Sequence, residues 1–135
     1  MTKFVRVAVA IGFCIDTAVA IIALFFQPLL GPLFDLPLKD PALTTIAGGE
    51  YVVVALIYAI VFRAPARYHA LLWVCALDQL FAALLPGIEI ARGHVAATYK
   101  TIGPIPLSAL LATVYALSAA RLGASPSAPS GSRAS

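Results

Sequence analysis

The stretch VRVAVAIGFCIDTAVAIIALFF, from Val5 to Phe26, decides the fold of this chain of 135 residues. Its only charged residues are Arg6 and Asp16, and its length matches the roughly 20 residues that an α-helix needs to cross the hydrocarbon core of a bilayer. A cleaved signal peptide has a shorter apolar core. Because Asp16 interrupts such a core and the apolar run continues well past Ala20, we predict a retained membrane helix.

Three further segments have a similar length and composition. Asp40 is a suitable N-cap for the second helix, with Pro41 at the first helical position, where a missing N–H costs nothing. We expect Pro86 and Gly87 to end the third helix, because proline disrupts a helix interior. The predicted helices cover residues 5–26, 41–62, 68–85 and 104–122.

The composition supports a membrane protein. The chain is 61% hydrophobic and only 11% charged, whereas soluble domains are about 45–50% apolar and about 25% charged. Two cysteines, Cys14 and Cys75, do not make a disulfide scaffold. We therefore predict an all-α fold, an integral membrane four-helix bundle over residues 1–122. Residues 123–135, rich in Ser, Ala, Pro and Gly, are expected to form a disordered cytoplasmic tail.

The basic residues predict the orientation of this multi-pass protein in the cytoplasmic (inner) membrane. Cytoplasmic loops carry an excess of Lys and Arg. The segments predicted on one side hold six such residues and those on the other side hold three, so both termini are expected to be cytoplasmic. The six are Lys3, Arg6, Arg63, Arg67, Arg121 and Arg133, and the three are Lys39, Arg92 and Lys100.

Several classes of function are not indicated by the sequence. The basic residues stand singly between apolar runs and form no patch for nucleic acid. His69 and His94 fall at opposite membrane faces, so they are not placed to ligate haem together, and no closely spaced His or Cys accompanies a carboxylate as metal sites require. We therefore expect no metal, no cofactor and no nucleic-acid partner.

Three carboxyl residues inside the predicted spans are the candidate site residues. Asp16 and Asp78 lie near the middle of the first and third helices, and Glu50 lies in the second. Their depths agree to within about one helical turn, ~5.4 Å. No Lys, Arg or His lies in the middle of a predicted span, at the depth of these carboxyls, to pair with them. Because a charge in hydrocarbon is expensive, such residues indicate a functional site.

A tyrosine joins these candidates. Tyr115 lies with Ser108, Ala112 and Ala119 on a stripe of small and polar residues in the fourth helix, and such stripes let membrane helices approach closely. We expect Tyr115 to reach a carboxyl at mid-depth, and Asp16 and Asp78 to face each other. The carboxyls cannot all be ionised there. Either they are protonated and only hold helices together, or a cation, a proton relay or a bound ligand completes the site.

Three short motifs resemble small bacterial membrane proteins of the DoxX-like family. They are Leu36-Pro37-Leu38-Lys39-Asp40-Pro41, Gly48-Gly49-Glu50 and Arg63-Ala64-Pro65-Ala66-Arg67-Tyr68, which together cover part of the middle third of the chain. The resemblance implies a four-helix bundle and a role as an accessory subunit of a redox membrane complex. Asp16 and Asp78 are not part of the family pattern.

The leading functional hypothesis is a non-enzymatic bundle in the lipid bilayer. It would act as an accessory subunit of a larger membrane complex, or bind a lipophilic small molecule, and a homo-oligomer fits either role. One alternative is an acid–base enzyme, an isomerase or cyclase acting on a membrane-soluble substrate through Asp16, Glu50, Asp78 and Tyr115. Another is a carrier coupled to protons or cations through the same carboxyls.

Overall fold

The structure is a computed structural model that describes residues 2–35 and 40–124. Every element in these ranges is helical, and the long helices are α1 (Thr2–Phe25), α3 (Pro41–Arg63), α4 (Leu71–Ala91) and α6 (Pro104–Gly123). A 3-10 helix, η1 (Gln27–Leu29), and the short helices α2 (Leu30–Phe34) and α5 (Tyr99–Ile102) lie in the connections. Four helical segments, the last one combining α5 and α6, are long and apolar enough to cross a membrane. This confirms the predicted all-α class and the prediction of four helices long and apolar enough to span a membrane.

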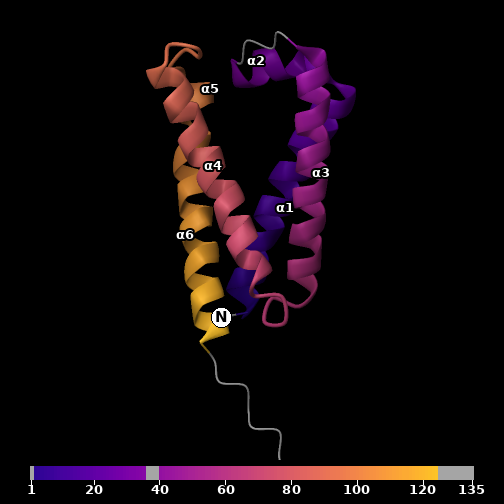
Figure 1. Cartoon of the computed structure of the whole chain (residues 1–135), viewed down its shortest axis with the longest axis vertical. Coiled ribbons are helices and arrows are strands. Elements are labelled where there is room, and N and C mark those ends of the chain that lie inside the picture. The colour runs from indigo at the N-terminus through magenta and orange to yellow at the C-terminus, as the bar shows by residue number, and fades with distance from the viewer. Residues whose placement is uncertain (1, 36–39, 125–135) are drawn as a thin grey trace, which may run out of the picture.

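The four long helices form two pairs. Helix α1 packs along α3, and α4 packs along α6. The two pairs meet near the N-terminus and diverge toward α2 and α5, so that the ribbon has the outline of a V (Figure 1). The N-terminus, the connection between α3 and α4, and the end of α6 all lie at the closed end, which we call the N-terminal end of the bundle (Figure 1). The opposite end is called the α2–α5 end.

This arrangement puts most of the predicted cytoplasmic segments at one end, as the charge count required. Lys3 and Arg6 begin α1, Arg63 ends α3, and Arg121 lies in the last turn of α6, all at the N-terminal end. Which side of the membrane this end faces stays a prediction. Lys39 and the predicted tail beyond residue 124 lie outside the described residues, as does most of the first motif of the family resemblance.

The core lies where the two pairs meet. Its fully buried side chains include Val5 and Val9 of α1, Tyr58 of α3, Leu72 of α4 and Tyr115 of α6. The helices come very close at Gly12, where an added Cβ would lie 2.6 Å from the hydroxyl of Tyr115 and 2.7 Å from Cε1 of Tyr58. A small residue at this position therefore lets two bulky tyrosines pack against α1.

The ends of two helices test the local predictions. Asp40 caps α3 as predicted, its Oδ1 accepting hydrogen bonds from the backbone N–H groups of Ala42 at 2.8 Å and Leu43 at 3.3 Å. The prediction that Pro86 ends the third helix is wrong, because α4 continues through it to Ala91. Proline removes one backbone donor, and membrane helices tolerate this where neighbouring groups or local adjustments satisfy the freed carbonyl.

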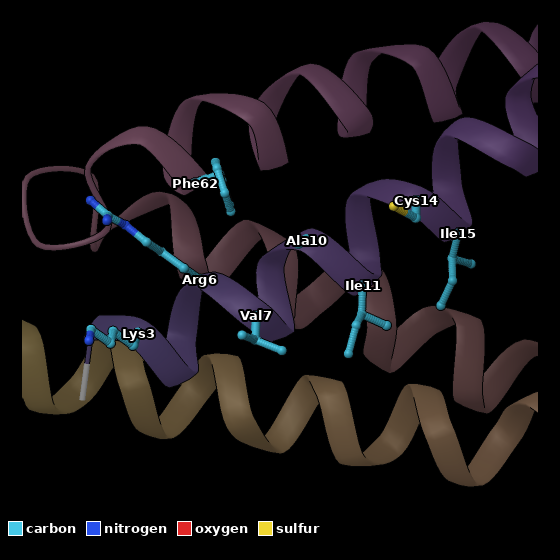
Figure 2. Close-up of a pocket in the computed structure, with 8 residues that line it drawn as sticks. All are labelled: Lys3, Arg6, Val7, Ala10, Ile11, Cys14, Ile15 and Phe62. Carbon is cyan, nitrogen blue, oxygen red and sulfur yellow. The ribbon is translucent and has the colours of Figure 1, made fainter.

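Large apolar side chains cover the outside of the bundle. Phe25, Leu43, Leu56 and Leu110 are each more than half exposed, which suits helices that face lipid. A groove of about 610 Å³ runs along α1 at the N-terminal end, with Phe62 of α3 at one edge (Figure 2).

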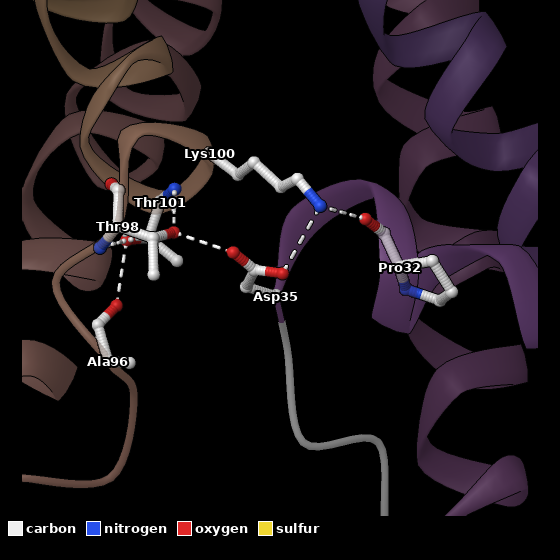
Figure 3. Close-up of polar contacts among 6 residues, drawn as sticks. All are labelled: Pro32, Asp35, Ala96, Thr98, Lys100 and Thr101. Carbon is white, nitrogen blue, oxygen red and sulfur yellow. Dashed lines mark hydrogen bonds and ion pairs between the residues drawn. The ribbon is translucent and has the colours of Figure 1, made fainter.

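A polar bridge joins the two helix pairs at the α2–α5 end. Asp35, which follows α2, accepts a hydrogen bond from Thr98, the N-cap of α5. Lys100 of α5 donates to the carbonyl of Pro32 in α2 at 2.6 Å and lies 3.4 Å from Asp35 Oδ1 (Figure 3). The V is therefore tied across its open end by side chains that are 60 or more residues apart along the chain.

Candidate functional site

Asp16 of α1 and Asp78 of α4 meet in the interior, between the two helix pairs. The Asp16 side chain is almost fully buried, with 2% of the residue exposed, and Asp78 is half-buried. Their carboxyl groups lie close enough to interact with each other. The predicted convergence of these two residues is confirmed. It arises because each lies near the middle of its helix, on the face toward the other pair.

Asp78 has two hydrogen-bond donors of its own. The Tyr58 hydroxyl of α3 lies 3.1 Å from Asp78 Oδ2, and Nε2 of the neighbouring Gln79 lies 3.0 Å from the same oxygen. Both donors are buried. Hydrogen bonds to a carboxylate oxygen stabilise its negative charge, so Asp78 is the member of the pair equipped to carry that charge.

Asp16 has no such support. Its Oδ2 is buried and has no donor, and the neighbouring Thr17 hydroxyl has no partner either. No ion pair joins Asp16 or Asp78 to a basic side chain within residues 2–35 and 40–124. Two ionised carboxylates offer each other only acceptors and repel. A single proton held between them turns the contact into a hydrogen bond, with Asp16 as donor and Asp78 as acceptor.

Tyr115 does not make the contact that the sequence predicted. Its hydroxyl donates to the backbone carbonyl of Ala8 at 2.7 Å, and its ring packs against Tyr58, with 5.7 Å between ring centroids and 57° between planes. Ala8 lies eight residues before Asp16, roughly 12 Å along the helix axis. Tyr115 therefore positions Tyr58, which in turn contacts Asp78.

Glu50 does not join the pair. Its side chain is exposed, while the buried face of α3 carries Thr44, Gly48, Ala55, Tyr58 and Val61. A residue two positions after Gly48 is turned well away from that face, since successive helical residues are about 100° apart. The expectation that three carboxyls share one site is therefore wrong, and the site contains two.

Two tyrosines of α3 lie at the pair and were not predicted as site residues. Tyr58 is the donor to Asp78, and the half-buried Tyr51 is close enough to both Asp16 and Asp78 to interact with them electrostatically. The two tyrosines are seven residues apart, and this spacing places side chains on one face of a helix. That spacing indicated a shared face, but not that this face turns toward the two carboxyls.

The pair does not resemble a conventional metal centre. No group of three or more His, Cys, Asp or Glu side chains capable of holding a metal ion occurs in the part of the chain that the structure describes. The site contains two carboxyls. Asp78 accepts hydrogen bonds from two neutral donors, whereas Asp16 Oδ2 has no donor. This arrangement can hold one proton, or one positively charged or hydrogen-bond-donating group.

Comparison of the chain with models of protein families, with curated proteins and with solved structures finds no match.

Proposed function

We propose that this chain is a small multi-pass protein of the cytoplasmic membrane that binds a lipophilic ligand carrying a positive charge or a hydrogen-bond donor. The ligand's polar group would contact both Asp16 and Asp78 and displace the proton that they share. The observation that carries the proposal is Asp16 Oδ2, an acceptor buried between the helix pairs without a donor. A buried polar atom without a partner costs free energy, and a bound donor would recover it.

The arrangement of the helices supports a ligand that arrives through the bilayer. Helices pack closely within each pair, whereas the pairs meet mainly toward the N-terminal end (Figure 1). The side chains exposed on the outside of the helices are largely apolar, so a ligand that arrives from the bilayer must be apolar over the remainder of its surface. A charge in this low-dielectric setting attracts its partner more strongly than in water, which favours a lipophilic cation over a neutral compound of the same shape.

The test uses dodecylammonium as the lipophilic cation, because its ammonium N–H groups can donate to Asp16 Oδ2. Its binding to the purified protein in detergent is measured by calorimetry in two buffers of different ionisation enthalpy, which counts the protons released. We expect proton release on binding for the natural chain. Replacing Asp78 by Asn should abolish the release and weaken binding by about tenfold or more, the equivalent of about 1.4 kcal/mol.

The matched control is Glu50→Gln, which removes a carboxyl from the exposed face of α3. It should leave both affinity and proton release unchanged. If Asp78→Asn and Asp16→Asn bind the cation as tightly as the natural chain does, the carboxyls only hold the helices together and the proposal fails.

A proton-coupled carrier is the second candidate. The V outline of the two helix pairs, joined at one end and tied across the other by polar side chains, favours it (Figure 1). A carrier must move its ligand, so proteoliposomes with an imposed pH gradient should accumulate the cation, and Asp78→Asn should stop this. An accessory subunit and an acid–base enzyme stay predictions of the sequence.

A further inference from the structure

The groove on α1 has two chemically different parts. Lys3 and Arg6 stand at the end nearest the N-terminus, and the remainder of the lining is apolar or a thiol (Figure 2). No acidic side chain lines it. The lining residues are Lys3, Arg6, Val7, Ala10, Ile11, Cys14, Ile15 and Phe62.

The charged end is organised by a contact between helices. Arg6 Nη2 donates to the backbone carbonyl of Arg63 at 3.3 Å, and this contact holds the guanidinium beside the connection that follows α3. Lys3 lies three residues earlier, on the same side of α1. Two basic side chains therefore stand at the same end of the groove, the end that would lie at the membrane interface.

The dimensions match one leaflet of a bilayer. Lys3 and Ile15 are twelve residues apart in α1, which corresponds to roughly 18 Å along the helix axis. A bilayer's hydrocarbon core is about 30 Å thick, so the groove extends from the interface to slightly beyond the midplane. Val7, Ile11 and Ile15 form its apolar floor and point from one face of α1 (Figure 2).

We propose that this groove binds one anionic phospholipid. The phosphate lies between Lys3 and Arg6, and one acyl chain lies along Val7, Ile11 and Ile15. Charge complementarity selects this occupant, because cations near a membrane surface attract anionic lipids, whereas a zwitterionic lipid brings no net charge. A second copy of the chain in the same orientation would set like charges against each other. The proposal does not depend on the function of the Asp16–Asp78 pair.

The experiment measures lipid binding to the delipidated full chain by native mass spectrometry in detergent. The probes are phosphatidylglycerol and phosphatidylcholine with the same palmitoyl and oleoyl chains. We expect phosphatidylglycerol to bind on the order of tenfold more tightly, the scale of effect that one or two basic residues give near a membrane. The double variant Lys3→Gln/Arg6→Gln should remove this preference.

Arg67→Gln is the matched control for charge. Arg67 belongs to the same end of the bundle but does not line the groove, and its guanidinium lies 5.5 Å from the ring centroid of Tyr68. This variant should keep the preference for phosphatidylglycerol. A preference that survives Lys3→Gln/Arg6→Gln, or that Arg67→Gln removes equally, would overturn the proposal.

The apolar part is tested by filling it. Val7→Trp places a bulky side chain in the groove, and Val53→Trp makes the same change on α3 at a position of similar exposure, 58% against 60%. Only Val7→Trp should reduce phosphatidylglycerol binding.

Alkylation of Cys14, which is exposed in the groove, should slow when phosphatidylglycerol is added, with buried Cys75 as the internal reference. If Val7→Trp instead dissociates an oligomer and leaves lipid binding intact, the groove is an interface between copies and the proposal is wrong.

Discussion

Thr98 Oγ1 donates a hydrogen bond of 2.8 Å to Asp35 Oδ2 and thereby joins the two helix pairs at the α2–α5 end of the bundle. The two residues are 63 positions apart in the sequence. The hydrogen bond from Thr98, and after it the one from Lys100, hold the pKa of the Asp35 carboxyl below its ordinary value. A lowered pKa means that the folded chain favours the ionised form, so this contact depends on pH.

The first prediction concerns acid. Because the folded pKa of Asp35 is lowered, its contribution to stability is present above the unfolded pKa of about 3.9 and is lost as the pH falls through the folded value. The midpoint of thermal unfolding in detergent should be lower for Asp35→Asn than for the natural chain at pH 6. This difference should shrink below about pH 4. The effect should be small, because the Asp35 side chain is 33% exposed.

Thr98→Val serves as the control for this first prediction. In the Thr98→Val background, Asp35 has lost its main donor. There, Asp35→Asn should lower the midpoint less than it does in the natural chain, as in a double-mutant cycle. A difference between the natural chain and Asp35→Asn that is constant from pH 6 to pH 3 would show that the bridge does not depend on ionisation.

The second prediction concerns Tyr58. Tyr58→Phe removes the 3.1 Å hydrogen bond to Asp78 and the 3.4 Å contact with the Cys75 carbonyl, and we expect the free energy of unfolding to fall by about 1–2 kcal/mol. Tyr99→Phe is the control, because Tyr99 is 81% exposed. Equal melting temperatures for the two variants would contradict the assigned hydrogen bond.

The third prediction concerns the close approach at Gly12. A methyl group there would lie 2.6 Å from the Tyr115 hydroxyl, so Gly12→Ala should destabilise the bundle by about 1–3 kcal/mol through overpacking. Gly49→Ala meets no atom within 4 Å and should instead stabilise α3 by about 0.5–1 kcal/mol, because alanine is the better helix former. Thermal unfolding in detergent distinguishes the two. A stabilising Gly12→Ala would mean that α1 and the tyrosines are farther apart.

The fourth prediction concerns topology. The charge count predicts that both termini lie in the cytoplasm, and the structure puts the N-terminus, the connection around Arg67 and the end of α6 at one end (Figure 1). In a bacterial host, a fluorescent protein fused after Arg67 or at the C-terminus should fold and emit. Alkaline phosphatase fused after Gly93, at the other end, should be active. Phosphatase activity from a C-terminal fusion would show that the orientation is the reverse of the predicted one.

The sequence by itself determined the number of helices that are long and apolar enough to span a membrane, and much of their local detail. A run of about 20 apolar residues has to satisfy its own backbone hydrogen bonds in lipid, which only a helix achieves within one segment. The N-cap Asp40 and the start of α3 at Pro41 also followed from the sequence, because a capping side chain and a proline in the first turn act only on the adjacent backbone. The meeting of Asp16 and Asp78 was also predictable, because carboxyls in hydrocarbon turn toward the bundle interior.

The tertiary structure alone decided which groups surround that pair. In a water-soluble helix, polar residues mark the outer face, but a helix in lipid is apolar on both its inner and outer faces, so periodicity does not reveal its rotation. That rotation leaves Glu50 exposed and turns Tyr58 toward Asp78. It also places the Tyr115 hydroxyl where it donates to the backbone carbonyl of Ala8. The continuation of α4 through Pro86 depends equally on the surroundings, because whether a helix survives a proline is settled by what satisfies the freed carbonyl.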